Sequence, residues 1–158
     1  MKILRNGFSI IELLIAISIS MILISMGSFY FRDFSRDEDM RNIINNLVLN
    51  IKTVKNEVVF SNNEATLGSN SGTNWNSYRL EINGSLISEI NIPNGYSLVA
   101  SEDGFSFRDD GFVIHDSGAA TNNNFLFTVC DNKRVNEKGK RIKLGVLGEI
   151  TYEETNCS

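Results

Sequence analysis

A single carboxylate, Glu12, stands inside an almost unbroken run of apolar residues from Phe8 to Phe31. A glutamate near the start of a membrane segment costs roughly 2–3 kcal/mol or more unless a positive group pairs with it. The chemistry that Glu12 offers is therefore ion pairing in a medium of low dielectric, where an unpaired carboxylate is very costly. The residue predicts a partner that carries positive charge.

The remaining reactive groups do not form a catalytic set. His115 is the only histidine, so no His-based metal cluster or dyad can form from this chain. The acidic pairs Glu102-Asp103 and Asp109-Asp110 are each followed by glycine, which is typical of turns rather than of an acid–base pair or a calcium loop. The sequence contains no Gly-x-Ser-x-Gly elbow and no Gly-x-x-x-x-Gly-Lys phosphate loop. We expect a protein that is not an enzyme and that has no cofactor or metal.

The residues around Glu12 resemble the prepilin signature of type IV pilins and type II secretion pseudopilins. A short leader containing Lys2 and Arg5 ends in Gly7, Phe8 begins the apolar run, and Glu12 follows within it. The resemblance implies that prepilin peptidase cleaves between Gly7 and Phe8 and that Phe8 becomes N-methylated. It also implies that Glu12 acts in assembly, because in this family the carboxylate faces the N-terminal amine of a neighbouring subunit.

Two other interpretations use the same residues. One is a secretory signal with Ser25-Met26-Gly27 as the cleavage site, although a charge near the start of its apolar core is not what such a signal needs. The other is an uncleaved transmembrane anchor, because a helix over residues 8–31 would rise roughly 36 Å at about 1.5 Å per residue. Neither interpretation explains Glu12 beside Gly7-Phe8.

Charge predicts the orientation. Lys2 and Arg5 precede the apolar run without acids nearby, so we expect the N-terminus to stay in the bacterial cytoplasm. The residues after Phe31 would then lie in the periplasm, attached to the inner membrane by a single span. The resemblance implies that the subunit later enters a pilus or pseudopilus tip.

Beyond the membrane run, apolar residues recur at three- and four-residue spacing, which indicates an amphipathic helix. They are Met40, Ile43, Ile44, Leu47, Ile51, Val54 and Val58. No proline occurs before Pro93, so one helix over residues 8–60 is the simplest interpretation. The predicted parts are a leader at 1–7, a transmembrane and filament-core helix at 8–31, an amphipathic half at 32–60 and a β-rich domain at 61–158.

Residues 61–77 are rich in Asn, Ser, Gly and Thr and predict a loop in which Trp75 is a core anchor. The rest predicts short strands, with a hairpin turn at Asn83-Gly84. The expected strands cover residues 78–82, 86–92, 96–99, 105–107, 112–114, 125–130, 141–146 and 149–152. Strands that follow one long helix imply an α+β fold in which an antiparallel sheet packs on the apolar face of that helix.

The order of the C-terminal segments also resembles the branch of FimT/FimU minor pilins and the H-type pseudopilin of type II secretion. The residues that carry this resemblance are Trp75, 105–111, 125–130, 141–144 and 148–150. Many members of the branch have a C-terminal disulfide, consistent with a bond between Cys130 and Cys157. Two free thiols are the alternative, and an oxidising compartment favours the bond.

Basic residues cluster once, and they are the candidate DNA contacts. They are Lys133, Arg134, Lys138, Lys140, Arg141 and Lys143. The alternative is a solvated hairpin tip on an acidic chain of net charge −4. DNA-uptake pilins of the FimT type have a Gly-Arg-x-Arg element near the C-terminus, where this chain has Gly148-Glu149-Ile150-Thr151. We therefore rank DNA binding low.

The sequence favours a minor (pseudo)pilin that initiates or caps a type IV pilus. The first alternative is an H-type pseudopilin of a type II secretion system, and the second is a FimT-like pilin that binds DNA for uptake. The implied partners are prepilin peptidase, other major and minor pilins or pseudopilins, and inner-membrane lipid.

Overall fold

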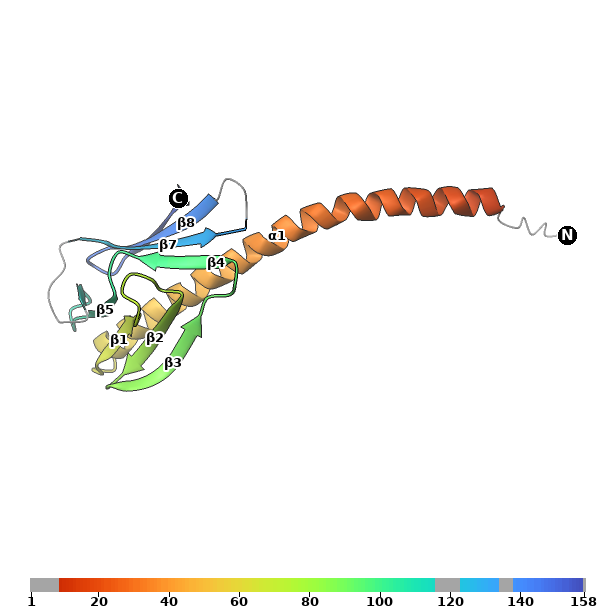
Figure 1. The fold of residues 1–158 in the computed structure, drawn as a ribbon. Coiled ribbons are helices and arrows are strands. Elements are labelled where there is room, and N and C mark those ends of the chain that lie inside the picture. The colour runs from red at the N-terminus through yellow and green to blue at the C-terminus, as the bar shows by residue number, and fades with distance from the viewer. Residues whose placement is uncertain (1–8, 116–122, 134–137, 158) are drawn as a thin grey trace, which may run out of the picture. The chain divides into compact units, whose positions relative to one another are not determined.

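The computed structural model describes residues 9–115, 123–133 and 138–157. The chain divides into two compact units, Met1–Glu38 and Asp39–Ser158. The helix α1, Ile10–Val59, runs through both, and every strand belongs to the second unit (Figure 1).

The 50 residues of α1 confirm the prediction of one long helix. The helix ends because Asn62 adopts a left-handed conformation, with φ of 55°. The amide of Asn63 then donates to the carbonyl of Glu57 at 3.0 Å, which satisfies one of the carbonyls left open at the end of a helix.

Within the second unit, one face of α1 forms part of the hydrophobic core. The buried helix residues are Met40, Ile43, Ile44, Leu47, Val48, Ile51 and Val54. Six of the seven predicted positions are therefore buried, and Val58 is partly buried against the same core. The three- and four-residue spacing predicted the buried positions correctly because it marks the face of α1 that packs against strands.

The strands form two antiparallel sheets rather than the single predicted sheet. The five-stranded sheet has the order β3-β2-β1-β5-β6, and the four-stranded sheet has the order β4-β7-β8-β9. The bounds in the first sheet are β1 Ala65–Gly68, β2 Ser77–Ile82, β3 Ser85–Asn91, β5 Gly104–Phe107 and β6 Val113–His115. The bounds in the second are β4 Tyr96–Ala100, β7 Phe125–Asp131, β8 Lys138–Leu144 and β9 Ile150–Asn156.

The prediction that residues 61–77 form only a loop was wrong, because β1 lies within them and is the middle strand of its sheet. Leu67 pairs with Leu80 on one side and with Phe105 on the other. Leu67 is fully buried, so its place in the sheet comes from long-range packing. The four residues of β1 are too short to show a period of two among their polar neighbours.

The predicted hairpin turn is confirmed. Asn83 and Gly84, with φ of 51° and 71°, connect β2 to β3 in the conformation that a two-residue hairpin of type I′ requires.

Trp75 is a core anchor, as predicted. Its ring lies 5.6 Å from that of Tyr78 on β2, 6.2 Å from Phe105 on β5 and 5.1 Å from Phe127 on β7. Its indole N–H donates to the carbonyl of Glu102 at 2.8 Å, so the polar atom of this buried side chain is satisfied. Trp75 thus joins the two sheets inside one core.

Candidate functional site

Ser9 and Glu12 form the N-terminal cap of α1. The carbonyl of Ser9 accepts from the amides of Glu12 and Leu13 at 3.0 and 3.1 Å. The amide of Ser9 lies 3.5 Å from Oε2 of Glu12, at the outer limit of a hydrogen bond. Ser-x-x-Glu at a helix start is the capping-box pattern, so the sequence itself contains the signal for this cap. In the single chain, the Glu12 carboxylate therefore turns back to its own backbone.

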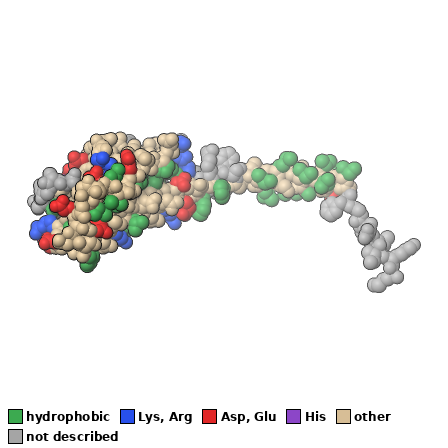
Figure 2. Space-filling view, turned by 90° about the horizontal axis from the view of Figure 1, so that it is seen from below, with side chains coloured by type: hydrophobic (Ala, Val, Ile, Leu, Met, Phe, Trp, Pro, Cys, Tyr) green, Lys and Arg blue, Asp and Glu red, His purple; other side chains and the backbone are tan. Residues whose placement is uncertain are grey.

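The segment Ile10–Gly27 is long and apolar enough to cross a membrane, and none of it is buried inside the protein. On the face shown in Figure 2, hydrophobic side chains predominate along this part of α1. The hydroxyls of Ser18, Ser20 and Ser25 each donate to a carbonyl of the same helix at 2.8 Å. These bonds satisfy the hydroxyls internally, as a hydrocarbon environment demands. Glu12 is the one acidic or basic residue of the segment.

The leader and the proposed cleavage site, Gly7 and Phe8, lie outside the described residues. The helix begins at Ile10. A cut after Gly7 would therefore place the new amine next to the capping residue Ser9.

The disulfide between Cys130 and Cys157 is present, as predicted, with Cα atoms 5.9 Å apart. It connects β7 to the residue that follows β9, across the intervening strand β8. Gly139 on β8 makes room for it. A Cβ atom built at Gly139 would collide with Sγ of Cys157 and would lie 2.9 Å from the Val129 carbonyl and 3.2 Å from Sγ of Cys130. The role of Gly139 depends on strand register, so the sequence alone does not reveal it.

The basic residues that the structure describes do not share one face of β8. Arg141 and Lys143 alternate along β8 with Ile142 and Leu144, which are fully buried. Lys140 belongs to the same alternating set as those buried residues and is half-buried, whereas Lys133 is exposed. Arg134 and the side chain of Lys138 lie outside the described part of the chain.

Acidic residues on β9 lie opposite these cations. The register pairs Lys140 with Glu154 and Arg141 with Glu153. Nη1 of Arg141 is 3.9 Å from Oε1 of Glu153, and its Nε–H donates to the Thr128 hydroxyl at 3.4 Å. The arrangement resembles a cross-strand charge ladder more than a phosphate-binding face.

The acidic pairs that we predicted to be turn residues have structural contacts. The Asp110 carboxylate pairs with Arg108 at 2.7 Å, within the turn between β5 and β6. The Asp103 carbonyl accepts from the Ser69 amide at 2.7 Å. His115 ends β6, one residue beyond the strand expected at 112–114, with Nδ1 3.9 Å from a Glu102 carboxylate oxygen. Among the described residues, no three His, Cys, Asp or Glu side chains gather as they would around a metal ion.

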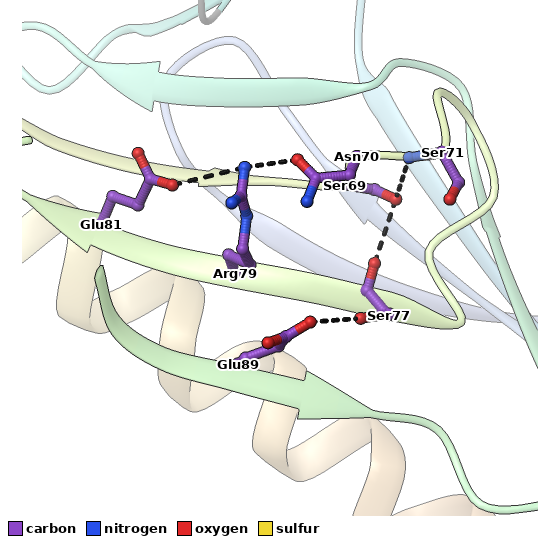
Figure 3. Close-up of polar contacts among 7 residues, drawn as sticks. All are labelled: Ser69, Asn70, Ser71, Ser77, Arg79, Glu81 and Glu89. Atoms are coloured by element: carbon purple, nitrogen blue, oxygen red, sulfur yellow. Dashed lines mark hydrogen bonds and ion pairs between the residues drawn. The ribbon is translucent and has the colours of Figure 1, made fainter. Parts of the chain in front are cut away.

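Side chains that line a polar hollow on the five-stranded sheet contact one another (Figure 3). The Arg79 guanidinium donates to the Asn70 side chain and lies 3.5 Å from Glu81. The Ser69 hydroxyl donates to the Ser77 carbonyl at 3.0 Å. These groups satisfy one another, so the cluster is a structural network.

Residues 4–28 match the family described as the prokaryotic N-terminal methylation motif. This match covers Gly7, Phe8 and Glu12. No curated protein matches the chain significantly.

The fold is similar to the crystal structure of the type IV minor pilin FimU from Pseudomonas aeruginosa strain PAO1. The TM-score is 0.59 at 13% sequence identity, over 76% of this chain and 92% of the other. At this identity the likeness establishes the fold: a long apolar N-terminal helix and antiparallel sheets. The chain thus combines a match to the prokaryotic N-terminal methylation motif with a fold similar to that of a type IV minor pilin.

Proposed function

We propose that this protein is a minor pilin with a structural role in initiating or capping a type IV pilus. The observation that carries the proposal is Glu12, a carboxylate on an exposed apolar helix segment with no cation in that segment. A carboxylate there is costly in lipid, and a neighbouring subunit that supplies a positive amine removes that cost. Glu12 therefore favours packing into a filament over permanent residence in the membrane.

The position at which α1 begins supports a role for leader cleavage in filament assembly. Cleavage between Gly7 and Phe8 by prepilin peptidase would create an amine two residues before the helix begins. A positive charge at a helix N-terminus is unfavourable, because the helix dipole is positive there. The Glu12 carboxylate of a neighbouring subunit would offset that charge and would fix the register of the two helices. N-methylation of Phe8 keeps the amine positive.

The leader charges support a cytoplasmic N-terminus, with Ile10–Gly27 in the inner membrane and the β-rich unit in the periplasm. The partners in this arrangement are inner-membrane lipid, prepilin peptidase and other pilins. In this proposal, prepilin peptidase cleaves the protein, and the protein itself is a structural subunit and not an enzyme.

Intact-mass spectrometry of the membrane-purified protein tests the proposal. We expect a mature chain that begins at Phe8 and carries one added methyl group. Replacing Gly7 with leucine should leave the uncleaved precursor in the membrane, whereas Gly27→Ala should be processed normally. A mature start at Ser28, or retention of Met1, would contradict the assignment.

The same motif and fold are also compatible with an H-type pseudopilin of a type II secretion system. The order of the C-terminal segments resembles both kinds of subunit and therefore does not separate the two roles. A strain in which the gene is deleted can separate them. Loss of surface pili with normal protein secretion supports the pilus role. Loss of secretion with normal pili would establish the alternative.

A further inference from the structure

The two sheets have four edge strands, and three of them are protected against pairing with another chain. The edge of β4 is covered by residues 73–76, whose backbone forms two hydrogen bonds with it. Strand β6 has only three residues, and its Val113 amide donates to the Val146 carbonyl at 2.9 Å. Strand β9 has two adjacent glutamates, Glu153 and Glu154. Coverage, shortness and charge are common means by which proteins prevent strand pairing at sheet edges.

The edge of β3 has no such protection (Figure 1). The strand Ser85–Asn91 has seven residues, contains no lysine or proline, and among the described residues pairs with β2 alone. Alternate backbone N–H and C=O groups of β3 therefore point away from the sheet without a strand beside them. Leu86 and Ile87 are 52% and 56% exposed, so two adjacent apolar side chains lie at this edge.

A β-bulge limits the length of the edge that can pair. Leu80 of β2 pairs with Ser88 and Glu81 pairs with Leu86, so Ile87 has no partner on β2. The regular part of the edge is 88–91, which would span about 13 Å at about 3.4 Å per residue. A pairing this short binds weakly by itself, which suits a contact between subunits that other contacts already hold together.

A groove lies at the end of this edge, between β3 and α1. It has a volume of about 150 Å³ and a mainly apolar lining. Ile43 of α1, Tyr78 of β2, Ile90 of β3 and the following Ile92 and Pro93 provide the apolar wall. A cavity of similar volume can hold a benzene molecule, so one apolar side chain of an added strand fits the groove.

The side chains around this edge favour a positively charged occupant. The ladder places Arg79 opposite Glu89, but the Arg79 guanidinium lies 3.5 Å from Glu81 (Figure 3). The Glu89 carboxylate accepts from the Ser77 hydroxyl at 3.1 Å and, within the described residues, forms no ion pair. Among the described residues that line the groove, Asp39 is the one charged side chain.

We propose that the edge of β3 and the adjoining groove bind an extended segment of a neighbouring pilin. The segment adds to β3 as a strand, presents a lysine or arginine to Glu89 and places an apolar side chain in the groove beside Ile90. A second copy of β3 does not fit this description, because it would supply another Glu89 instead of a cation. The inference rests on the proposed function, which supplies neighbouring pilins in the same compartment.

Peptide binding to the detergent-purified full chain tests the site. The probe is a fluorescent, end-blocked peptide, Thr-Lys-Leu-Thr-Val-Thr. Its lysine and leucine are adjacent because adjacent residues of a strand face opposite sides, as Glu89 and Ile90 do. We expect saturable binding in fluorescence anisotropy, and we expect it to weaken several-fold when the peptide carries glutamate in place of lysine.

Two N-methylated forms of the peptide test for strand pairing. A strand presents its hydrogen-bonding groups alternately to its two sides, and only one side would face β3. Methylating one alternate set of amides should therefore abolish binding, whereas methylating the other set should leave it intact. No saturable binding of the parent peptide, or an equal effect of both methylation patterns, would overturn the proposal.

Charge reversal locates the binding site. Glu89→Lys should make the chain prefer the glutamate peptide over the lysine peptide. Glu153→Lys, which changes the net charge equally but lies on β9, should leave the original preference unchanged. If Glu89→Lys still preferred the lysine peptide, the segment would not bind at β3.

The role in the filament is measured in the cells that encode the protein. Glu89→Lys should be cleaved between Gly7 and Phe8 as the parent chain is, but its recovery in sheared pili should be several-fold lower than that of Glu153→Lys. Equal recovery of the two variants would contradict a neighbouring pilin as the occupant.

The peptide and the mature N-terminus separate this inference from the proposed function. A chain that starts at Phe8 but binds no peptide overturns the site on β3 and leaves the proposed function standing. A chain that retains its leader but binds the peptide as described supports the site and contradicts the processing.

Discussion

At the scale of single residues, Glu12 has two separable roles. In the single chain its carboxylate lies 3.5 Å from the Ser9 amide and caps the helix, and in the proposed filament it pairs with a neighbour's amine. Glutamine can serve the capping role, because a capping box accepts Glu or Gln at this position, but it carries no charge. The conservative substitution therefore distinguishes the cap from the ion pair.

We predict that Glu12→Ala and Glu12→Gln are both inserted and cleaved but enter filaments poorly. Removing the carboxylate eliminates its insertion cost, roughly 2–3 kcal/mol, so membrane levels should not fall. The measurement is immunoblotting of sheared pili against membrane fractions. If Glu12→Gln assembled as well as the parent chain, capping would be sufficient and the ion pair would be refuted.

Gly139 is the second residue with a specific requirement, because the disulfide Cys130–Cys157 packs against its Cα. We predict that Gly139→Ala lowers the free energy of unfolding by about 1–3 kcal/mol, the usual cost of overpacking, and slows disulfide formation. Thiol titration and thermal melting of the detergent-purified chain measure both effects. Gly27→Ala is the matched control, because apart from its chain neighbours and the nearby backbone of its own helix, no atom of the described residues lies within 4 Å of the added Cβ. Equal thiol content and melting temperature in the two variants would contradict this role.

At the scale of elements, the sequence predicted what local patterns determine. The spacing from Met40 to Val54 specified the buried face of α1, and Asn83-Gly84 specified the turn between β2 and β3. Strand β1 and the division into two sheets were missed, because they depend on which strands pair. Alternation places a side chain on one face of a strand, but it does not select the partner strand.

Tyr78 joins α1 to β2 through a buried hydroxyl. Nδ2 of Asn50 donates to this hydroxyl at 3.3 Å. Burial raises the pKa of Tyr78 above its ordinary value, and the hydrogen bond from Asn50 offsets part of that rise. At neutral pH the hydroxyl is protonated in both the folded and unfolded states. As the pH rises through the ordinary tyrosine pKa of about 10, the unfolded state ionises first and the free energy of unfolding falls.

We predict that Tyr78→Phe costs about 1 kcal/mol at neutral pH, through the lost hydrogen bond, and makes the alkaline loss of stability shallower. Tyr152→Phe is the control, because Tyr152 is 62% exposed. Denaturant melts of the detergent-purified chain at several pH values between neutral and strongly alkaline give both quantities. An unchanged alkaline slope in Tyr78→Phe would show that Tyr78 does not carry the linkage.

At the scale of the whole molecule, the sequence predicted the kind of fold but not the arrangement of surface charge. Lysines and arginines that are neighbours between Lys133 and Lys143 look like one cluster in the sequence. In the structure, β8 alternates its side chains between two faces, and β9 brings Glu153 and Glu154 opposite its cations. The partial neutralisation of these positive charges becomes visible only once β8 is paired with β9.

Whether the protein binds DNA depends on its whole charge distribution. The chain has a net charge of −4, and loss of the leader removes Lys2 and Arg5 and makes the mature protein more acidic. We predict at most weak, sequence-independent binding that falls steeply with added salt, because long-range repulsion outweighs a few partly compensated cations. Titration of the detergent-purified chain with duplex DNA at two salt concentrations measures it.

Glu153→Gln with Glu154→Gln should strengthen the binding at low salt, since these carboxylates oppose Lys140 and Arg141. Micromolar or tighter binding by the parent chain at physiological salt, abolished by Lys140→Glu with Arg141→Glu, would instead make this a DNA-uptake pilin.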